Sequence, residues 1–199
     1  MGEEPGRRER KKQRTREALV AEAMRLFEQQ GYDETTVAEI ATAADVSTRT
    51  FFLHFPTKED VLLANTQVRV DLGADVIAGR GPGESAADAL GRAIEEMIVN
   101  TWNTDLASGL AGLRAGLLTS SPAAQARLLQ RFLAAHADLT EALLRAYPDE
   151  LDPIEAAALV GAVVGAVGAA ALTSLRHGDP PEQVRDAMRR ATALAVHPR

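Results

Sequence analysis

The sequence predicts an all-α protein of about nine helices, and three observations support this fold class. The 199 residues are rich in Ala, Leu, Arg and Glu, which favour helices. Only 4% of the residues are aromatic, and no run alternates apolar with polar residues in the way a half-buried strand does. Helix start and stop signals recur along the whole chain. A chain of this length can bury a core without metals or disulfides.

Four helices are predicted in the first 80 residues, after a basic arm at residues 1–14. A helical spacing of apolar residues predicts a helix over residues 16–30, ended by a glycine. A Thr-x-x-Glu capping box opens a helix over 36–44, and a serine cap opens one over 47–53. A threonine cap after a proline starts a fourth helix, predicted to run unbroken over 57–78.

Five more helices are predicted in the rest of the chain. Each has a Ser, Thr or Asp cap near its start, in three cases with proline at or next to the first helical position. Their expected ranges are 85–102, 104–118, 121–147, 152–178 and 179–195.

The composition argues against an enzyme, a metal site or a bound cofactor. The absence of cysteine excludes a disulfide scaffold, a thiolate zinc site and a cysteine nucleophile. The four histidines are far apart and have no ligand spacing, and there is no Gly-x-Ser-x-Gly motif or phosphate-binding loop. We therefore expect neither catalysis nor a cofactor.

One apolar stretch, residues 156–172, contains no polar side chain. It is shorter than the roughly 20 residues that span a bilayer, and its alanines and glycines make it only mildly hydrophobic. We expect a buried helix rather than a membrane span. No signal peptide is visible, so we expect a cytoplasmic protein without a membrane partner.

The charge of the chain is unevenly distributed. The net charge is -6, yet residues 7–16 hold seven basic residues against the single Glu9. A basic arm before a nearly neutral region and an acidic remainder is typical of a DNA-binding protein with its contact surface at one end. The alternative is a solvated tail without a partner.

Residues 31–60 contain the most specific pattern in the chain. Two short predicted helices flank a tight turn, and apolar residues give each helix one buried face, as in a helix-turn-helix. The second helix begins with small hydroxyl residues and Arg49, side chains that suit base edges and phosphates. The alternative is an ordinary helical hairpin with capping hydroxyls.

This segment resembles the DNA-binding domain of the TetR family of bacterial transcriptional regulators. The resemblance covers about residues 15–63, a quarter of the chain. The elements that carry it are Gly31-Tyr32, Thr35-Thr36, Ile40-Ala41, Val46-Ser47, Phe51-Phe52, His54-Phe55 and Thr57-Lys58-Glu59.

The resemblance implies roles for individual residues. Thr36 and Lys58 are expected to contact phosphates, and His54 is expected to contact the DNA backbone. Phe52 and Leu53 depart from the family pattern, because many members carry tyrosines there whose hydroxyls bind DNA. The expected DNA-binding residues are Lys11, Lys12, Arg14, Thr36, Ser47, Thr48, Arg49, Thr50, Phe52, His54 and Lys58.

Alternatives stay open for two of these residues. Ser47 is more readily interpreted as a helix cap than as a base reader. Lys58 could be only a solvated charge, although its place at a helix start favours a phosphate contact.

The resemblance implies a homodimer formed through the last two helices, and the sequence has a suitable surface there. Glycines at spacings of three and four residues leave one helix face open to the close approach of another helix. Packing of these glycines within one subunit is the alternative. The residues expected at the dimer interface are Gly161, Gly165, Gly168, Leu172, Val184, Met188 and Ala191.

An effector pocket is expected among the middle helices. Its apolar lining predicts a small lipophilic molecule, although His136 could instead be a satisfied core residue. The candidate lining residues are Met97, Trp102, Leu113, Leu117, Phe132 and His136.

These observations and the resemblance together predict a ligand-responsive repressor. It would bind a palindromic operator in double-stranded DNA as a homodimer and be released by its effector, with the helix 57–78 as the lever. We expect a basic arm at 1–14, a helix-turn-helix domain at 15–60 and a ligand-binding and dimerisation domain at 61–199. The alternative is a helical interaction or lipid-binding protein that binds no DNA.

Overall fold

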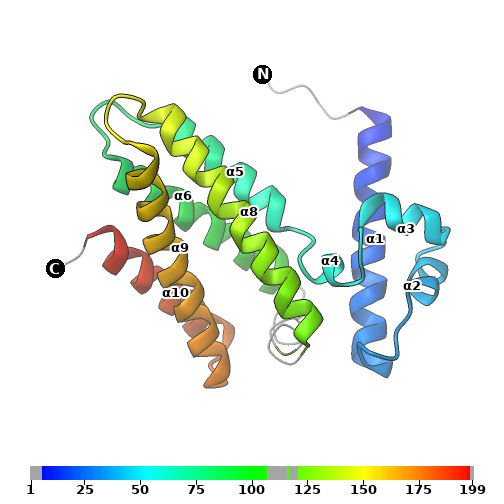
Figure 1. The fold of residues 1–199 in the computed structure, drawn as a ribbon. Coiled ribbons are helices and arrows are strands. Elements are labelled where there is room, and N and C mark those ends of the chain that lie inside the picture. Colours follow the sequence, from blue (N-terminus) through cyan, green and yellow to red (C-terminus); the bar gives the residue numbers. More distant parts are fainter. Residues whose placement is uncertain (1–5, 107–115, 117–120, 198–199) are drawn as a thin grey trace. The chain divides into compact units, whose positions relative to one another are not determined.

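The computed structural model is all-helical, as the sequence predicts. Over the residues it describes, it has nine α-helices, one π-helical turn and no strand (Figure 1). The described residues are 6–106, 116 and 121–197.

The contacts divide the chain into two compact units, which we describe separately. Unit 1 runs to Ala64 and also holds the first turns of a later helix, up to Arg127. Unit 2 starts at Asn65, leaves out those turns and continues to the C-terminus.

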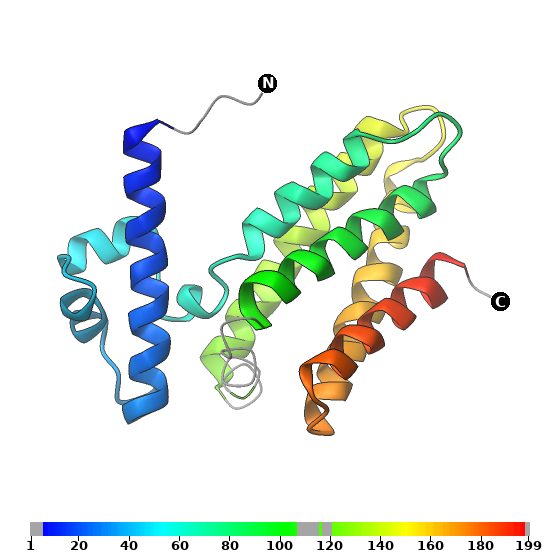
Figure 2. The ribbon, with the colours of Figure 1, turned by 180° about the vertical axis from the view of Figure 1, so that it is seen from behind.

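Unit 1 is built from α1 (Arg7–Gln30), α2 (Val37–Ala43), α3 (Thr48–His54) and α4 (Glu59–Leu62). Both ribbon views show α2 and α3 beside α1 (Figures 1 and 2). Its buried hydrophobic residues come from all four helices and include Leu19, Ala23, Met24, Phe27, Ile40, Phe51, Phe55 and Val61.

The two caps predicted around the turn are confirmed. Thr36 Oγ1 accepts a hydrogen bond from the Glu39 amide at 3.2 Å, and the Glu39 carboxylate accepts one from the Thr36 amide at 2.8 Å. The hydrogen bonds that this carboxylate accepts from the amide and the hydroxyl of Thr36 lower the pKa of Glu39. Ser47 Oγ accepts from the Thr50 amide at 3.1 Å and so begins α3. Asp45, in the turn between α2 and α3, has a positive φ of 53°.

The basic segment is helical, which differs from the arm that we expected. α1 begins at Arg7 rather than near residue 16, so the run of basic residues forms the first turns of the helix. Arg, Lys and Gln are good helix formers, and nothing in this run breaks a helix.

The predicted unbroken helix over 57–78 is wrong. The structure has two helices there, α4 and α5 (Thr66–Ala78), separated by a turn. Leu63 and Ala64 in this turn are buried, and the Ala64 carbonyl accepts a hydrogen bond from Arg16 Nη2 at 2.6 Å. A contact with α1 therefore takes the carbonyl that a continuing helix would use.

Unit 2 contains α5, α6 (Ala86–Thr101), the π-helical turn η1 (Trp102–Leu106), α9 (Pro153–Arg176) and α10 (Pro181–Val196). It also contains most of α8 (Pro122–Ala146), whose residues up to Arg127 belong to unit 1. The predicted helix over 104–118 lies mostly outside the described residues. The core of unit 2 draws on α5, α6, α8 and α9 and includes Val70, Ile77, Leu90, Ala93, Ile94, Leu139, Leu143, Val160 and Val163.

α9 is only partly buried, whereas the sequence predicts a buried helix. Its capping box of Asp152 and Glu155 forms as predicted, and one side of the helix packs in the core. However, only 22% of its most apolar 18-residue window is buried. By length and composition α9 could cross a membrane, but a core helix of a soluble protein passes the same test.

Candidate DNA-binding site

The helix α3 presents a mixed surface to solvent. Phe51 is fully buried, whereas Thr48, Arg49, Phe52 and Leu53 are exposed. Arg49 and Leu53 lie one turn apart on this surface, as do Thr48 and Phe52. The structure therefore brings together a guanidinium, a hydroxyl and two large apolar groups on one helix face.

Thr50 and Ser47 are engaged with each other at the start of α3. Their hydroxyl oxygens are 2.9 Å apart, and Thr50 is half-buried. Ser47 is the N-cap of α3, which agrees with its interpretation as a helix cap. A role of Ser47 in reading bases stays a prediction.

His54 ends α3 in a positively charged setting. Its imidazole is half-buried, and burial, followed by the charges of Arg16 and Lys12, lowers its pKa. His54 is therefore neutral at neutral pH. A hydrogen bond from Arg16 Nη1 to the His54 carbonyl places α1 next to this end of α3.

Arg16 is a structural residue that our sequence analysis missed. Its guanidinium donates to the carbonyls of His54 at 2.9 Å and Ala64 at 2.6 Å, and it lies 4.2 Å from the centre of the Phe55 ring. It thereby ties the end of α3 and the turn after α4 to α1. In the sequence it is one basic residue among seven in its run, and nothing there singles it out.

Lys58 is held against the loop between α1 and α2. Its ammonium group donates to the carbonyls of Tyr32 at 2.7 Å and Thr35 at 3.0 Å, and it lies 4.1 Å from the centre of the Tyr32 ring. The Tyr32 hydroxyl donates to Glu59 at 2.6 Å, and burial together with this carboxylate raises the pKa of Tyr32. Lys58 is thus more than a solvated charge, and its contact with a phosphate stays a prediction.

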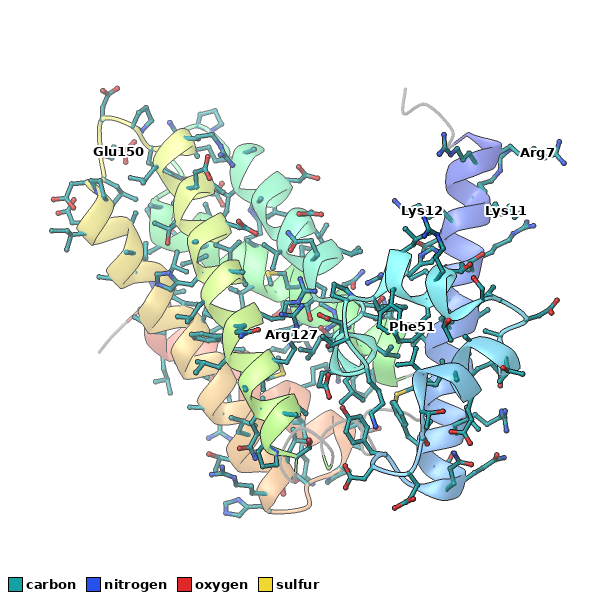
Figure 3. All side chains as sticks on the ribbon, turned by 45° about the vertical axis from the view of Figure 1, so that its right-hand side comes forward. Arg7, Lys11, Lys12, Phe51, Arg127 and Glu150 are labelled. Carbon is teal, nitrogen blue, oxygen red and sulfur yellow. The ribbon has the colours of Figure 1, made fainter. Side chains whose placement is uncertain are left out.

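The first turns of α1 form a positively charged surface. Arg7, Lys11 and Lys12 project outward from this end of the helix (Figure 3). Arg14 is also exposed, and together with Arg7, Arg10 and Lys11 it lines a hollow of about 220 Å³. A helix surface of this kind attracts the phosphates of a nucleic acid.

The amino-acid sequence matches a known family model over the region just described. Residues 19–64 match the model of the bacterial regulatory proteins of the tetR family. The chain is also 40% identical over 94 residues to the transcriptional regulator TcmR of Streptomyces glaucescens. That match covers 47% of this chain and 42% of TcmR, less than half the length of either protein.

A second relative extends the similarity over most of the chain. The transcriptional regulator EthR of Mycolicibacterium smegmatis is 33% identical over 175 residues, which cover 84% of this chain and 79% of EthR. The chain belongs to the TetR family of transcriptional regulators. Members of this family are DNA-binding regulators rather than enzymes.

The fold also agrees with that of a solved TetR-family structure. FadR of Thermus thermophilus, crystallised in complex with lauroyl-CoA, matches with a TM-score of 0.55 and 24% sequence identity. The match covers 91% of this chain and 93% of FadR.

In the described part of the chain, no group of three His, Asp or Glu residues could hold a metal ion.

The effector pocket expected in unit 2 stays a prediction, and two of its candidate residues, Leu113 and Leu117, lie outside the described part of the chain. Phe132 is half-buried on α8. Met97 packs against Gly73, where an added Cβ would lie 2.8 Å from the Met97 sulfur. Arg185 stacks over Trp102, with 4.1 Å between the guanidinium carbon and the ring centre.

His136 is a satisfied residue inside unit 2. Its Nε2 lies 2.9 Å from the carbonyl oxygen of Ala157 on α9. A Cβ at Gly161 would lie 3.4 Å from the same nitrogen, so the glycine leaves room for the imidazole to reach the α9 backbone. A role for His136 in binding an effector stays a prediction.

The glycines expected at a dimer interface differ from one another. Gly161 faces His136 of its own subunit, as the alternative of packing within one subunit describes. A Cβ at Gly165 or Gly168 would meet nothing within 4 Å. Met188 and Ala191 on α10 pack partly against the core of unit 2, while Leu172 and Val184 are half-buried.

An open groove of about 620 Å³ lies between α9 and α10, which are side by side in both ribbon views (Figures 1 and 2). Its walls combine alanines with polar residues, including Thr173, His177 and Arg190.

Proposed function

We propose that this protein is a repressor that binds a palindromic operator in double-stranded DNA as a homodimer and is released by a small lipophilic molecule. The observation that carries the proposal is the exposed face of α3, with Thr48 and Arg49 at its start and Phe51 holding the opposite side in the core. A helix anchored in this way can enter the major groove without losing its own packing.

The surroundings of α3 support binding to the phosphates on either side of the groove. The exposed basic residues of α1, among them Lys11, Lys12 and Arg14, supply positive charge. The starts of α2 and α4, at Thr36 and Lys58, are expected to face the backbone, because helix N-termini favour anions. Arg49 is expected to read a guanine, its most frequent partner in the major groove.

The partly buried α9 supports a homodimer. Most of the apolar window of α9 is only half-buried, which leaves apolar surface for a partner, and open positions at Gly165 and Gly168 allow a second helix to approach closely. A second copy of α9 and α10 would complete a four-helix bundle across a two-fold axis. Such a dimer would place two copies of α3 on the two halves of a palindrome.

The effector is expected to be lipophilic because the residues expected to line its pocket are mostly apolar. FadR, which shares this fold, was crystallised with a fatty acyl thioester, lauroyl-CoA. Release from the operator requires that the effector bind the DNA-free state more tightly, with typical coupling energies of about 1–3 kcal/mol. The protein would act in the bacterial cytoplasm, at the nucleoid when bound to DNA.

The lever expected at 57–78 needs revision, because a turn separates α4 from α5. The helix that runs continuously through both units is α8, with Arg127 in unit 1 and the buried Leu139 and Leu143 in unit 2. We therefore assign to α8 the mechanical connection between the effector-binding and DNA-binding units.

Selection of bound DNA from a random duplex library tests the proposal directly. We expect enrichment of a palindrome that binds two chains and whose affinity falls steeply with salt. Replacing Lys11 by Ala should reduce the log–log salt slope by about one unit per chain if Lys11 contacts one phosphate. Lack of enrichment, or a single chain on each duplex, would contradict the proposal.

A further inference from the structure

Two large apolar side chains are exposed on α3, Phe52 at 55% and Leu53 at 73%. Among the described residues of unit 1, no other large hydrophobic side chain is exposed to this degree. The pair is therefore a local feature of α3.

The position of Phe52 is fixed by the core. Its ring meets Phe51 edge-on, with ring centres 5.5 Å apart and an interplanar angle of 85°. Phe51 is itself fully buried and contacts Phe55 at a centre distance of 5.8 Å. The contact with Phe51 therefore orients the Phe52 ring, and more than half of the side chain remains exposed.

The pair shares its surface with the polar residues at the start of α3. Leu53 lies one turn after Arg49, and Phe52 lies one turn after Thr48, and all four side chains are exposed. In the proposed complex this surface meets the base edges. The exposed surfaces of Phe52 and Leu53 are then buried against the base edges on the floor of the major groove.

The chemistry of that floor limits what the pair can contact. Base edges offer hydrogen-bond donors and acceptors, together with one apolar group, the C5 methyl of thymine. Burying a donor or acceptor against a phenyl ring would remove its water without replacing the hydrogen bond. A thymine methyl has no such cost and gains from leaving water.

We infer that Phe52 and Leu53 make the protein specific for thymine methyl groups beside the base pair read by Arg49. This inference rests on the proposed DNA-binding function. One helical turn rises about 5.4 Å, and base pairs are stacked about 3.4 Å apart. The thymines therefore lie within about two base pairs of the one contacted by Arg49.

The test uses the full-length protein and the operator from the library selection. Each thymine of a half-site is replaced in turn by deoxyuridine, which removes the methyl group and keeps base pairing. We expect affinity to fall about three- to fivefold at one or two positions, the value of burying one methyl group. Other thymine positions should show no change.

Three variants assign the effect to the pair. Phe52→Ala and Leu53→Ala should bind more weakly and lose the difference between thymine and deoxyuridine. Val68→Ala is a matched control, because Val68 is 58% exposed on α5 in unit 2, and it should keep the difference. Leu53→Ala keeps the test decisive if Phe52→Ala disturbs Phe51, which a melting curve would reveal.

Several results would overturn the inference. Equal affinity for thymine and deoxyuridine at every position would mean that the pair contacts sugars or backbone instead. A deoxyuridine effect that persists in both variants would assign methyl reading to other residues. The variants could instead change their oligomeric mass in sedimentation without DNA and keep the affinity difference between thymine and deoxyuridine. That result would mean that Phe52 and Leu53 contact another protein chain. Failure to enrich any DNA would overturn the proposed function itself.

Discussion

Removal of Arg127 should strongly destabilise unit 1. Its Nε donates to Asp60 Oδ1 at 2.9 Å and its Nη2 donates to Asp60 Oδ2 at 2.8 Å, a two-pronged ion pair between the start of α8 and α4. The amide and the hydroxyl of Thr57 also donate to Oδ2, at 3.2 and 3.1 Å. Figure 3 shows the position of Arg127 on α8.

The burial of the two partners sets the size of the effect. The Asp60 side chain is 1% exposed, so Arg127→Met leaves a carboxylate in the interior without its guanidinium. Loss of one partner of a buried ion pair costs about 3–5 kcal/mol. Because the Arg127 side chain is 26% exposed and water can replace its outer part, we expect about 3 kcal/mol, near the lower end. For a chain of this size the melting temperature should fall by about 6–12 °C.

A double-mutant cycle separates the ion pair from the packing of the two side chains. Unfolding free energies are measured by urea denaturation and circular dichroism for Arg127→Met, Asp60→Asn and the double variant. Asp60→Asn should cost about 1.5–3 kcal/mol, since it weakens hydrogen bonds to a charged partner. The double variant should cost less than the sum of the single variants by at least about 1.5 kcal/mol.

A surface ion pair of the same helix provides the control. Arg145 and Glu141 are paired one turn apart on α8, and both side chains are more than half exposed. Arg145→Met should cost only about 0.3–0.5 kcal/mol. The reasoning is refuted if Arg127→Met costs no more than this control, or if the cycle is additive within about 0.5 kcal/mol.

Three further predictions concern the proposed function. Arg49→Ala should lower operator affinity by about 1–3 kcal/mol without changing the mass of the dimer, as measured by mobility shift and sedimentation; equal affinity would remove Arg49 as a base reader. Gly165→Leu should leave the subunit folded and break the dimer, because a Cβ at this position has no neighbour within 4 Å in the subunit. Gly161→Ala should change the packing against His136 and keep the dimer. An intact Gly165→Leu dimer would contradict the proposed interface. Operator affinity should rise as the pH falls from about 8 to about 6, because burial and nearby cations lower the pKa of His54 in the free protein and DNA phosphates would raise it in the complex. His54→Gln should abolish this pH dependence of affinity. If the pH dependence persists in the variant, another group causes it.

Local signals in the sequence were sufficient for most helix boundaries. The capping boxes at Thr36 and Asp152 and the cap at Ser47 form as predicted, because each depends on residues within one helical turn. The helical start of α1 at Arg7 was also within reach, since its basic residues are good helix formers. The same residues carry the positive charge of the run, which is why the charge pattern alone predicts an arm and not a helix.

The break between α4 and α5 could not be predicted in the same way. Residues 63–65 include no glycine or proline, and the two before Asn65 are good helix formers. The turn coincides with hydrogen bonding of the Ala64 carbonyl to Arg16, which is 48 positions away in the chain. The pair of Asp60 and Arg127, 67 positions apart, was invisible for the same reason.

The glycines of α9 show what helical spacing cannot predict. The spacing places them on one part of the helix surface, but it does not say what each glycine contacts. Gly161 allows His136 to reach the backbone within the subunit, and Gly165, one turn later, faces open space. Helical periodicity places both on neighbouring parts of the helix surface and cannot say which neighbour each one accepts. The same applies to the low buried share of this apolar helix, which is high enough in hydropathy to pass for a membrane span. A second copy of the chain, as in the proposed homodimer, would account for both the open glycines and the apolar surface that the subunit leaves partly uncovered.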